Sequence, residues 1–293
     1  WRAPLRAQSA TGTAEGLFTR PDRRWTHFTQ QTGGLASNDV LAVISSDEAV
    51  WFGTEQGVSR YDGMWTTFAA PVGEEAIAPM YGQPPQEPVR ALATGSCCGE
   101  VWAGGDSGQL YRWDGRAWRH SWAAPSPIQA VVDWRGEVYV GAADGLYRFG
   151  SAGIVRETAH SGAPVFALLV HGDRLWAGCE DGLWRREQDG WVREADEPGH
   201  FIHGVYALGR AADGSLAAGT VHGAALRNAN TGEWRLVPVR DEYGRDAAVQ
   251  ALVTDRDGRL WAGTDGAGAY EFTLDPLRAV VYGPAGNTSL TTR

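Results

Sequence analysis

The stretch VQALVTDRDGRLWAGTD, from Val249 to Asp265, decides the fold because its pattern returns along the whole chain. Related stretches begin at Val40, Val89, Ile128, Val165 and Val205. Each repeat has a glycine after a tryptophan, or after the residue that replaces it, and these glycines recur about every 42 residues. They are Gly12, Gly53, Gly104, Gly141, Gly178, Gly219 and Gly263. A period of this length indicates an architecture built from one repeated supersecondary unit.

Within one repeat the pattern is typical of short β-strands. Val249 to Thr254 alternates and is rich in β-formers, and Asp257-Gly258 is a hairpin turn signal. Residues 260–264 make a second strand, and two more follow in a repeat, as in residues 57–61 and 65–68. No stretch has the 3.6-residue apolar period of a long helix. Four strands in about 42 residues fit one blade of a β-propeller.

We therefore predict an all-β chain that forms a single β-propeller over residues 1–293, with seven four-stranded blades. The blades start near residues 5, 40, 89, 128, 165, 205 and 249. The first blade is expected to be incomplete at the N-terminus, because it begins at its second strand. Residues 283–293 are expected to be a connector that leads to the ring-closing strand, so the polypeptide would continue past Arg293. The alternative is a ring whose first blade has only three strands.

The tryptophans and glycines of the repeat are its expected structural anchors. Tryptophans on the second and fourth strands are expected to wedge between neighbouring blades, because one blade is too small to bury its own faces. Tyr139 and Ala217 replace the second-strand tryptophan in two repeats, and Val155 replaces the fourth-strand tryptophan in another. The anchors are Trp51, Gly53, Trp102, Gly104, Gly141, Trp176, Gly178, Gly219, Trp261 and Gly263.

The pattern V-x-A-L-x-x-D-x-x-G-x-L-W-A-G-T-x-x-G resembles the two-component regulator propeller repeat. The linker from Gly34 to Val40 is similar to the connector between blades in that family, and so is the stretch from Asn287 to Leu290. The resemblance implies the extracytoplasmic or periplasmic sensor domain of a hybrid histidine kinase. Such a domain would bind a small extracellular ligand, in that family a glycan, and pass the signal across a membrane.

The composition excludes several classes of partner. The 293 residues carry 26 basic and 35 acidic side chains, a formal net charge of −9, and no lysine. An acidic chain without a basic stripe is a poor binder of nucleic acid or of anionic membranes. No apolar run reaches the ~20 residues of a membrane-spanning helix. Three cysteines give neither a disulfide framework nor a metal-ligand spacing, and no cofactor or metal is expected.

Acidic residues recur in the turn after each second strand. If the blades form a ring, these turns lie on one face and make an acidic rim that would attract a cation, an amine or a basic protein surface. The alternative is plain turn chemistry, since Asp before Gly favours a turn. The rim residues are Glu15, Glu55, Asp106, Asp144, Glu180, Asp181 and Asp265, with His222 at this position in the sixth repeat.

Three long connectors are the expected contact surface. They span residues 69–88, 194–204 and 239–248 and should emerge on the face of the acidic rim. Apolar and aromatic residues in these connectors favour contact with a ligand or a protein partner. Two tryptophans outside the repeat pattern, one expected in a connector and one in a turn, favour the same interpretation. The alternatives are a floppy insertion and tryptophans that fold back over a blade edge. The candidates are Ile77, Met80, Tyr81, Trp122 (the connector), Trp134 (the turn) and Phe201.

Three classes of function compete on this sequence. The resemblance favours a non-catalytic sensor domain, while a rigid propeller with variable loops equally suits a protein-interaction subunit of a larger assembly. An enzyme is not expected. The GDSG motif around Ser107 is similar to that of trypsin-like proteases, but the repeat explains it as a turn. His200 and His203 lack a third zinc ligand, and a propeller-type lyase would need His and Glu at the channel mouth, where His222 is expected.

Overall fold

The computed structural model describes residues 10–13, 16–19, 26–69, 82, 84–97, 99–151, 153–157, 161–194, 202–241, 243–255, 257–274, 277–283 and 286–291. In these ranges the secondary structure consists of β-strands, turns and bends, as the sequence predicts. No helix of the described chain has the length and apolarity needed to cross a membrane. The chain divides into two compact units, Trp1–Glu157 and Thr158–Arg293, and each is described by itself.

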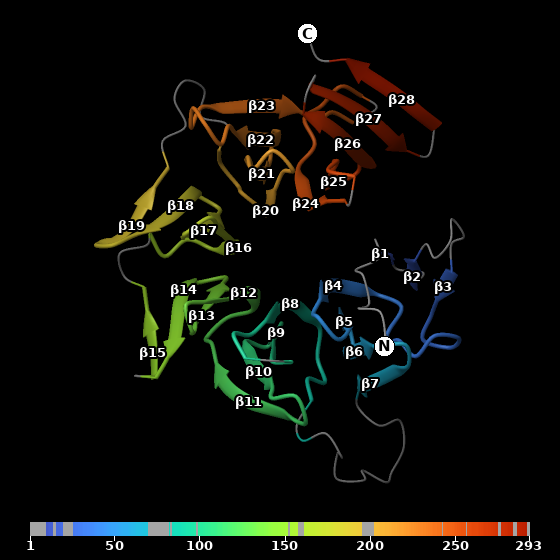
Figure 1. Cartoon of the computed structure of the whole chain (residues 1–293), viewed down its shortest axis with the longest axis vertical. Coiled ribbons are helices and arrows are strands. Elements are labelled where there is room, and N and C mark those ends of the chain that lie inside the picture. Colours follow the sequence, from blue (N-terminus) through green and yellow to red (C-terminus); the bar gives the residue numbers. More distant parts are fainter. Residues whose placement is uncertain are drawn as a thin grey trace. The chain divides into compact units, whose positions relative to one another are not determined.

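The first unit contains four antiparallel sheets, in each of which neighbouring strands are consecutive in the chain (Figure 1). The first sheet has three strands, β1 (Ala10–Thr13), β2 (Gly16–Thr19) and β3 (Thr26–Phe28). The others have four strands each: β4 (Val40–Ser45), β5 (Val50–Thr54), β6 (Gly57–Tyr61) and β7 (Trp65–Ala69); β8 (Val89–Thr94), β9 (Val101–Gly105), β10 (Gln109–Trp113) and β11 (Trp118–Ala123); β12 (Ile128–Trp134), β13 (Glu137–Ala142), β14 (Gly145–Gly150) and β15 (Gly153–Arg156).

The second unit contains three sheets of the same kind, two with four strands and one with five. They are β16 (Val165–His171), β17 (Arg174–Cys179), β18 (Gly182–Glu187) and β19 (Gly190–Arg193); β20 (Ala207–Arg210), β21 (Leu216–Thr220), β22 (Gly223–Arg227) and β23 (Trp234–Pro238); β24 (Val249–Thr254), β25 (Leu260–Thr264), β26 (Ala269–Leu274), β27 (Leu277–Gly283) and β28 (Gly286–Thr291).

The prediction of seven four-stranded blades is wrong, because the structure has six blades with a full set of strands. Strands β1 to β3 make only a three-stranded sheet. Thr13 pairs with Gly16 as Thr54 pairs with Gly57, so β1 occupies the position of a second strand. Among the described residues, no strand pairs with the other edge of β1. The missing partner of that edge is the physical reason for the lower blade count.

The last sheet also differs from the expectation for residues 283–293. Instead of running as an unpaired connector, Gly286–Thr291 forms β28, which hydrogen-bonds to β27 and extends the sheet to five strands. The register is regular, with Gly283 opposite Gly286 and Arg278 opposite Thr291. A ring-closing strand beyond this segment stays a prediction.

The repeated glycine of the second strand allows one sheet to approach the next. A Cβ atom on Gly53 would overlap the carbonyl oxygen of Val89, the residue that opens the following sheet. Because glycine has no Cβ atom, it alone fits at such a position. These glycines therefore set the spacing between consecutive sheets. The equivalent pairs are Gly104 with Ile128, Gly178 with Val205 and Gly219 with Val249.

Aromatic side chains fill the space between consecutive sheets. The ring of Trp51 in β5 lies 5.9 Å from that of Phe68, 5.7 Å from that of Trp113 and 5.8 Å from that of Trp118. Trp102 in β9 is also buried, against the sheet that follows its own. The hydrophobic clusters are thus shared between pairs of sheets, and each sheet depends on its neighbours for burial.

Candidate functional site

The turn between the second and third strands is tied to the connector that leads into the same sheet. Its backbone N–H donates to a connector carbonyl, from Asp106 to Pro88 at 3.0 Å and from Asp265 to Ala248 at 2.9 Å. The glycine that follows the turn has a φ of 136° at Gly182, a conformation that favours glycine. We call this end of each sheet the connector end. The opposite end, with the turns between strands one and two and between strands three and four, is the hairpin end.

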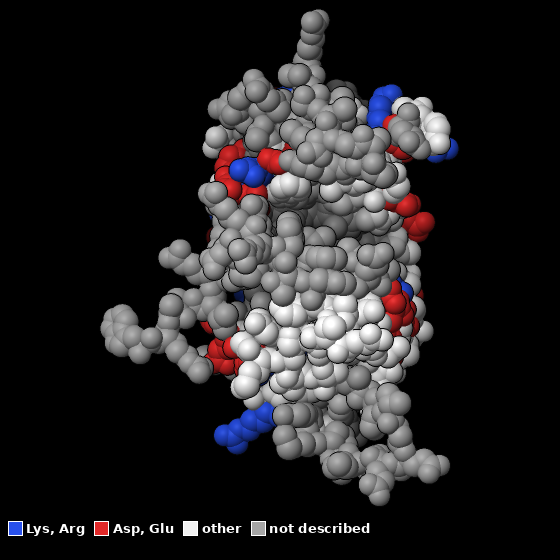
Figure 2. Space-filling model, turned by 90° about the vertical axis from the view of Figure 1, so that its right-hand side faces the viewer, with Lys and Arg blue, Asp and Glu red and all other residues white. Residues whose placement is uncertain are grey.

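In the first unit, Arg90 of β8 partly neutralises the expected acidic rim. Its Nε and Nη2 donate to the two carboxylate oxygens of Asp106, at 2.6 and 3.0 Å, and its Nη2 lies 3.8 Å from Glu55 Oε1. The hydrogen bond with Asp106 raises the pKa of Arg90. Figure 2 shows acidic side chains in small separate clusters, several of them beside a basic side chain. A cation at this turn would compete with Arg90.

Asp144 is also engaged within the protein. Burial alone would raise its pKa, but hydrogen bonds from the Ser126 and Tyr147 hydroxyl groups outweigh that effect, so the pKa lies below its usual value. Burial and the hydrogen bond to Asp144, 2.6 Å long, raise the pKa of Tyr147 to about 12. The ring of Trp122 lies 5.0 Å from that of Tyr147. Trp122 therefore lies in β11 and packs on the next sheet, whereas the sequence placed it in a connector.

In the second unit the carboxylates of the acidic turns differ in how many hydrogen bonds and ion pairs they make. The Asp181 carboxylate accepts a hydrogen bond of 3.0 Å from Trp184 Nε1. Glu180 and Asp265 are exposed, and within the described part of the chain their carboxylates have no ion pair. The acidic residues thus face solvent on this unit more than on the first.

The connector of residues 239–248 folds into a small hairpin at the connector end of the last sheet. Arg240 and Asp246 form an antiparallel bridge. The Asp241 carboxylate accepts hydrogen bonds from the backbone N–H groups of Tyr243 and Arg245, both 2.9 Å, and from Arg245 Nε at 2.7 Å. The Asp241 carboxylate thus ties together the backbone of Tyr243 and both the backbone and the side chain of Arg245.

The tip of this hairpin presents an aromatic side chain to solvent. Tyr243 is 74% exposed, and the Arg245 guanidinium lies 5.1 Å from the centre of its ring. His222, at the adjacent turn, has its Nδ1 3.2 Å from Asp246 Oδ2. The sequence analysis did not select Tyr243. The turn signal Asp241-Glu-Tyr-Gly could have marked it, because Tyr in a rigid exposed turn is a frequent contact residue.

Of the remaining predicted contact residues, the structure describes Trp134. Trp134 lies at the hairpin end, at the end of β12, with the Arg135 guanidinium 4.6 Å from its ring centre. Arg135 has a φ of 57°, which is uncommon for a residue other than glycine. The calls on Glu15, Ile77, Met80, Tyr81 and Phe201 fall outside the described residues. In the described ranges, no group of three or more His, Cys, Asp or Glu side chains has an arrangement that could hold a metal ion.

Comparison with known proteins concerns both the repeat and the fold. Residues 243–266, which include the tip of the hairpin and strand β25, match the family model "two component regulator propeller". No curated protein sequence matches the chain.

Several solved structures share the fold at low sequence identity. The extracellular domain of BT4673 from B. thetaiotaomicron, described as a one component or hybrid two component system, is 18% identical, with TM-scores of 0.65 and 0.66. The match covers 88% or 89% of this chain but only 36% of that one. A streptogramin B lyase is 15% identical over 84% of this chain and 88% of its own, with a TM-score of 0.62.

PorZ, a surface component of the type-IX secretion system of Porphyromonas gingivalis, is 14% identical over 95% of this chain and 50% of its own, with a TM-score of 0.61. At these identities the likeness concerns the fold alone, which is that of a β-propeller. The evidence for the family comes from the recurring V-x-A-L and L-W-A-G-T pattern and from the match at residues 243–266. The chain carries the repeat of the two component regulator propeller family, as its sequence predicts.

Proposed function

We propose that this chain is a non-catalytic recognition domain that works outside the cytoplasm, as the sensing part of a two-component regulator. The repeat at residues 243–266 and the likeness to the extracellular domain of BT4673 support this proposal. In this view the ligand or partner binds at the connector ends of the sheets, and the bound state is passed to a signalling module.

The observation that carries the proposal is the exposed pair of Tyr243 and Arg245 in the connector of residues 239–248. Both are of the residue types that most often dominate binding energy. Hydrogen bonds from the Tyr243 and Arg245 backbone N–H groups to Asp241 reduce the conformational entropy that these residues would lose on binding. The exposed Tyr243 ring suits stacking on a sugar, and the same pair would also anchor a protein partner.

The proposal is tested by binding measurements on the full chain. The chain is titrated calorimetrically with short neutral and acidic oligosaccharides, and native mass spectrometry of the protein from its own source records stable partners. We expect one oligosaccharide class, or one stoichiometric protein partner, to bind. Tyr243→Ala should weaken that binding about tenfold or more, as loss of a contact hot spot does.

Met64→Ala is the matched control, because Met64 is 76% exposed but lies in the β6–β7 turn at a hairpin end. Its binding should equal that of the unaltered chain. Failure to detect any oligosaccharide or partner would refute the recognition proposal. Turnover of a bound compound would refute its non-catalytic part.

A further inference from the structure

The last residue of β16, His171, places an imidazole between two consecutive sheets of the second unit. Successive side chains of a strand point to opposite faces of the sheet, so Leu169 and His171 share a face. Leu169 packs in the cluster that the sheet β16–β19 shares with the sheet β20–β23, and His171 therefore faces the sheet β20–β23 as well. This place is at the hairpin end of the strands, and the inference drawn from it does not depend on the proposed function.

The sheet that His171 faces presents two arginines. Arg210, Leu216 and Arg227 are direct partners across β20, β21 and β22, so their side chains leave the sheet on the same face. That face is the one toward β16–β19, because Leu216 packs in the shared cluster and the Arg227 guanidinium lies 5.9 Å from the centre of the Trp176 ring in β17. The imidazole therefore meets positively charged side chains.

The glutamates of the two sheets are already engaged by arginines. Glu194 lies 3.2 Å from Arg227 Nε and also contacts Arg185. Glu187 lies 2.8 Å from Arg185 Nε and 3.9 Å from Nε of Arg174, the residue that pairs with the histidine across β16 and β17. A proton taken up by the imidazole would therefore have to compete with these arginines for a carboxylate.

The turn between β20 and β21 approaches the imidazole with its backbone. The ring donates a hydrogen bond to the backbone of Gly214. The Asp213 carboxylate in this turn accepts hydrogen bonds of 2.9 Å from the backbone N–H and the hydroxyl group of Ser215, and Asp173 lies in the exposed turn after β16. The other ring nitrogen, Nδ1 of His171, is inaccessible to solvent and has no hydrogen-bond partner within the described part of the chain.

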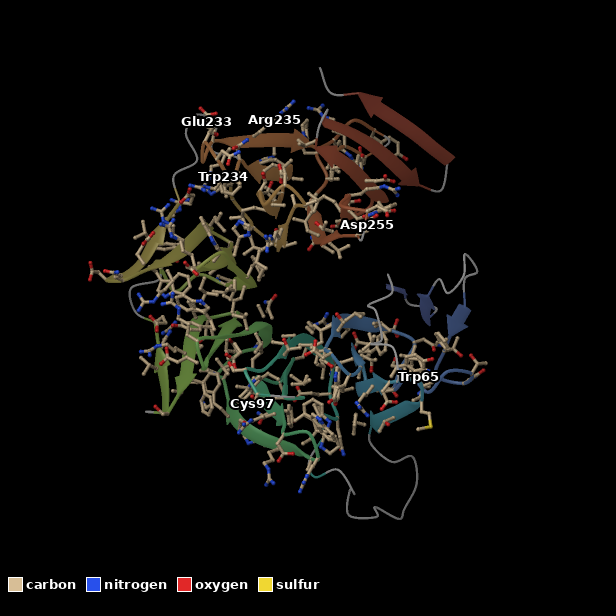
Figure 3. All side chains as sticks on the ribbon, in the orientation of Figure 1. Trp65, Cys97, Glu233, Trp234, Arg235 and Asp255 are labelled. Carbon is tan, nitrogen blue, oxygen red and sulfur yellow. The ribbon has the colours of Figure 1, made fainter. Side chains whose placement is uncertain are left out.

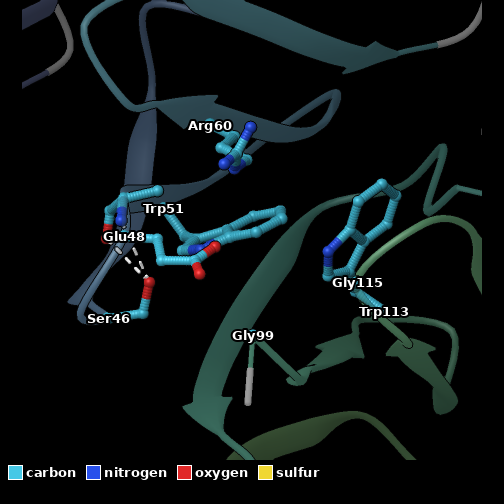
Figure 4. Close-up of a pocket in the computed structure, with 8 residues that line it drawn as sticks. Ser46, Glu48, Trp51, Arg60, Gly99, Trp113 and Gly115 are labelled. Carbon is cyan, nitrogen blue, oxygen red and sulfur yellow. Dashed lines mark hydrogen bonds between the residues drawn. The ribbon is translucent and has the colours of Figure 1, made fainter.

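The corresponding place in the first unit differs in its chemistry. Ser46 there follows the start of its repeat by as many residues as His171 does. Figure 4 shows that Ser46 bonds within its own turn, where its hydroxyl donates to the Ala49 carbonyl oxygen at 3.1 Å, and that the acidic Glu48 lies in the same turn. A titratable imidazole opposite arginines is thus a property of the sheets β16–β19 and β20–β23 and not of the repeat.

Folding favours the uncharged form of this imidazole. Burial, together with the positive charges of Arg210 and Arg227, lowers the pKa of His171 below 6.5 and outweighs the hydrogen bond to Gly214, which acts in the opposite direction. A basic group whose pKa is lowered by folding stabilises the fold above its unfolded pKa. That contribution is lost as the pH falls from about 6.5 toward the folded pKa.

We propose that His171 makes the contact between the sheets β16–β19 and β20–β23 sensitive to acid. Above about pH 7 the imidazole is neutral and the two sheets pack as described. As the pH falls below about 6, the imidazole takes up a proton, which adds a positive charge opposite Arg210 and Arg227. The new N–H group at Nδ1 finds no acceptor among the described residues, so the contact between the sheets weakens.

The test is the thermal stability of the full chain between pH 7.5 and pH 5. The melting temperature of the unaltered chain should fall over this range by about 2–4 °C more than that of His171→Gln. Glutamine keeps an N–H donor for the backbone of Gly214 but takes up no proton. Carboxyl groups with a lowered pKa, such as that of Asp255, lose their contribution only below about pH 4, outside this range.

A second pair of variants tests the role of the arginines. Arg210→Gln removes a positive charge that faces the imidazole, so the fall in melting temperature between pH 7.5 and pH 5 should become smaller. Arg235→Gln is the matched control. Arg235 (labelled in Figure 3) lies in the same sheet but follows Trp234, which packs in the shared cluster, and so it lies on the opposite face. Its replacement should leave the fall unchanged.

NMR of the histidine side chains keeps the test decisive if His171→Gln does not fold. The imidazole signal that shifts in Arg210→Gln but not in Arg235→Gln belongs to His171, and in the unaltered chain it should titrate below about pH 6.5. The proposal is overturned if this signal titrates at or above that pH. It is also overturned if His171→Gln and the unaltered chain lose stability equally between pH 7.5 and pH 5.

Discussion

The sheet of β4–β7 and the sheet of β24–β28 carry the same repeat residues but bury them differently. In the first, Trp51 is 2% exposed and Gly53 lies against Val89 of the following sheet. In the second, Trp261 at the equivalent position is only half-buried, and the one described residue that a Cβ atom on Gly263 would meet within 4 Å is Ala251 of the same sheet.

The difference shows which contributions to stability come from a single repeat and which come from the contact between two repeats. Both sheets have the same strand pairing between the first and second strands, including the same register shift near the start. What differs is that the sheet of β4–β7 is followed by another described sheet within its own unit, whereas the sheet of β24–β28 is the last one described in its unit. Strand pairing is therefore a property of the single repeat, whereas burial of its tryptophan and use of its glycine are properties of two consecutive repeats.

The largest expected change in the free energy of unfolding comes from replacing each of the two tryptophans in a separate variant. Trp51→Ala should lower the free energy of unfolding by about 3–5 kcal/mol, as deletion of a fully buried aromatic side chain does. Trp261→Ala should cost about 1–2 kcal/mol, because the side chain is half-buried. Urea unfolding of both variants measures the difference. Equal losses would mean that Trp261 is covered in solution as fully as Trp51.

The next largest loss of unfolding free energy is expected when an ion pair between two sheets is broken, and it should exceed the loss from breaking an ion pair within one sheet. Glu194 is almost fully buried, and its carboxylate contacts Arg185 of its own sheet. Its Oε1 also lies 3.2 Å from Arg227 Nε and 3.4 Å from Trp234 Nε1, both in the next sheet (Trp234 is labelled in Figure 3). Glu194→Gln should cost about 2–3 kcal/mol, because it takes the carboxylate away from Arg227 and removes one of the two carboxylates that Arg185 contacts, the other being Glu187.

Glu271 of the last sheet is the matched comparison for Glu194. Its carboxylate lies 3.3 Å from Nε of Arg259, which belongs to the same sheet. Glu271→Gln should cost about 1 kcal/mol or less, since Arg259 is half-exposed and also approaches Asp257. Thermal unfolding of both variants tests the order. A larger loss for Glu271→Gln would reverse the assignment of inter-sheet contacts as the stronger ones.

The glycines provide the third comparison. Gly53→Ala should cost about 1–3 kcal/mol, because the new Cβ atom meets the backbone of Val89 and the sheets must shift. Gly263→Ala should change the free energy of unfolding by about 0.5 kcal/mol or less, since its Cβ atom would make only an ordinary contact of 3.6 Å with Ala251. Chemical denaturation measures both. A costly Gly263→Ala would show that another surface approaches this glycine.

The smallest expected effect is a pH dependence that belongs to the last sheet. Burial works to raise the pKa of Asp255 (labelled in Figure 3), but a hydrogen bond of 2.9 Å from Trp261 Nε1 and two backbone N–H groups lower it below 3.8. A carboxyl group with a lowered pKa in the folded state stabilises the fold above the unfolded value. That contribution is lost as the pH falls from about 4 toward the folded pKa.

Trp261→Phe should therefore reduce the acid sensitivity of stability below pH 4, while Trp51→Phe should leave it unchanged. Melting temperatures between pH 2 and pH 5 provide the measurement. An unchanged acid profile in Trp261→Phe would show that the backbone N–H groups alone set the pKa of Asp255.

The sequence predicts well what a single repeat determines. The alternation of Val249 to Thr254 and the turn at Asp257-Gly258 predict a hairpin. In the structure Val249–Thr254 forms β24, and Asp257 and Gly258 lie in the turn before β25. Trp122, which the sequence analysis expects in a connector, lies in β11. The strand pairs across this stretch through a register shift, which local composition does not reveal.

The blade count and the sites depend on contacts between distant residues. In the described part of the chain the first sheet has three strands, with no strand paired to one edge of β1, and the pattern of a single repeat does not predict this. The hairpin that presents Tyr243 rests on the bridge between Arg240 and Asp246.

The contact of a repeated glycine with the opening residue of the next sheet has a consequence for the gene. The contact uses Gly on one side and Val or Ile on the other in the pairs Gly53 with Val89, Gly104 with Ile128 and Gly219 with Val249. Unequal recombination that duplicates or deletes one whole repeat therefore joins the same two residue types at the new junction. A coding sequence that gained or lost one whole repeat would thus keep the same contact between consecutive repeats at the new junction.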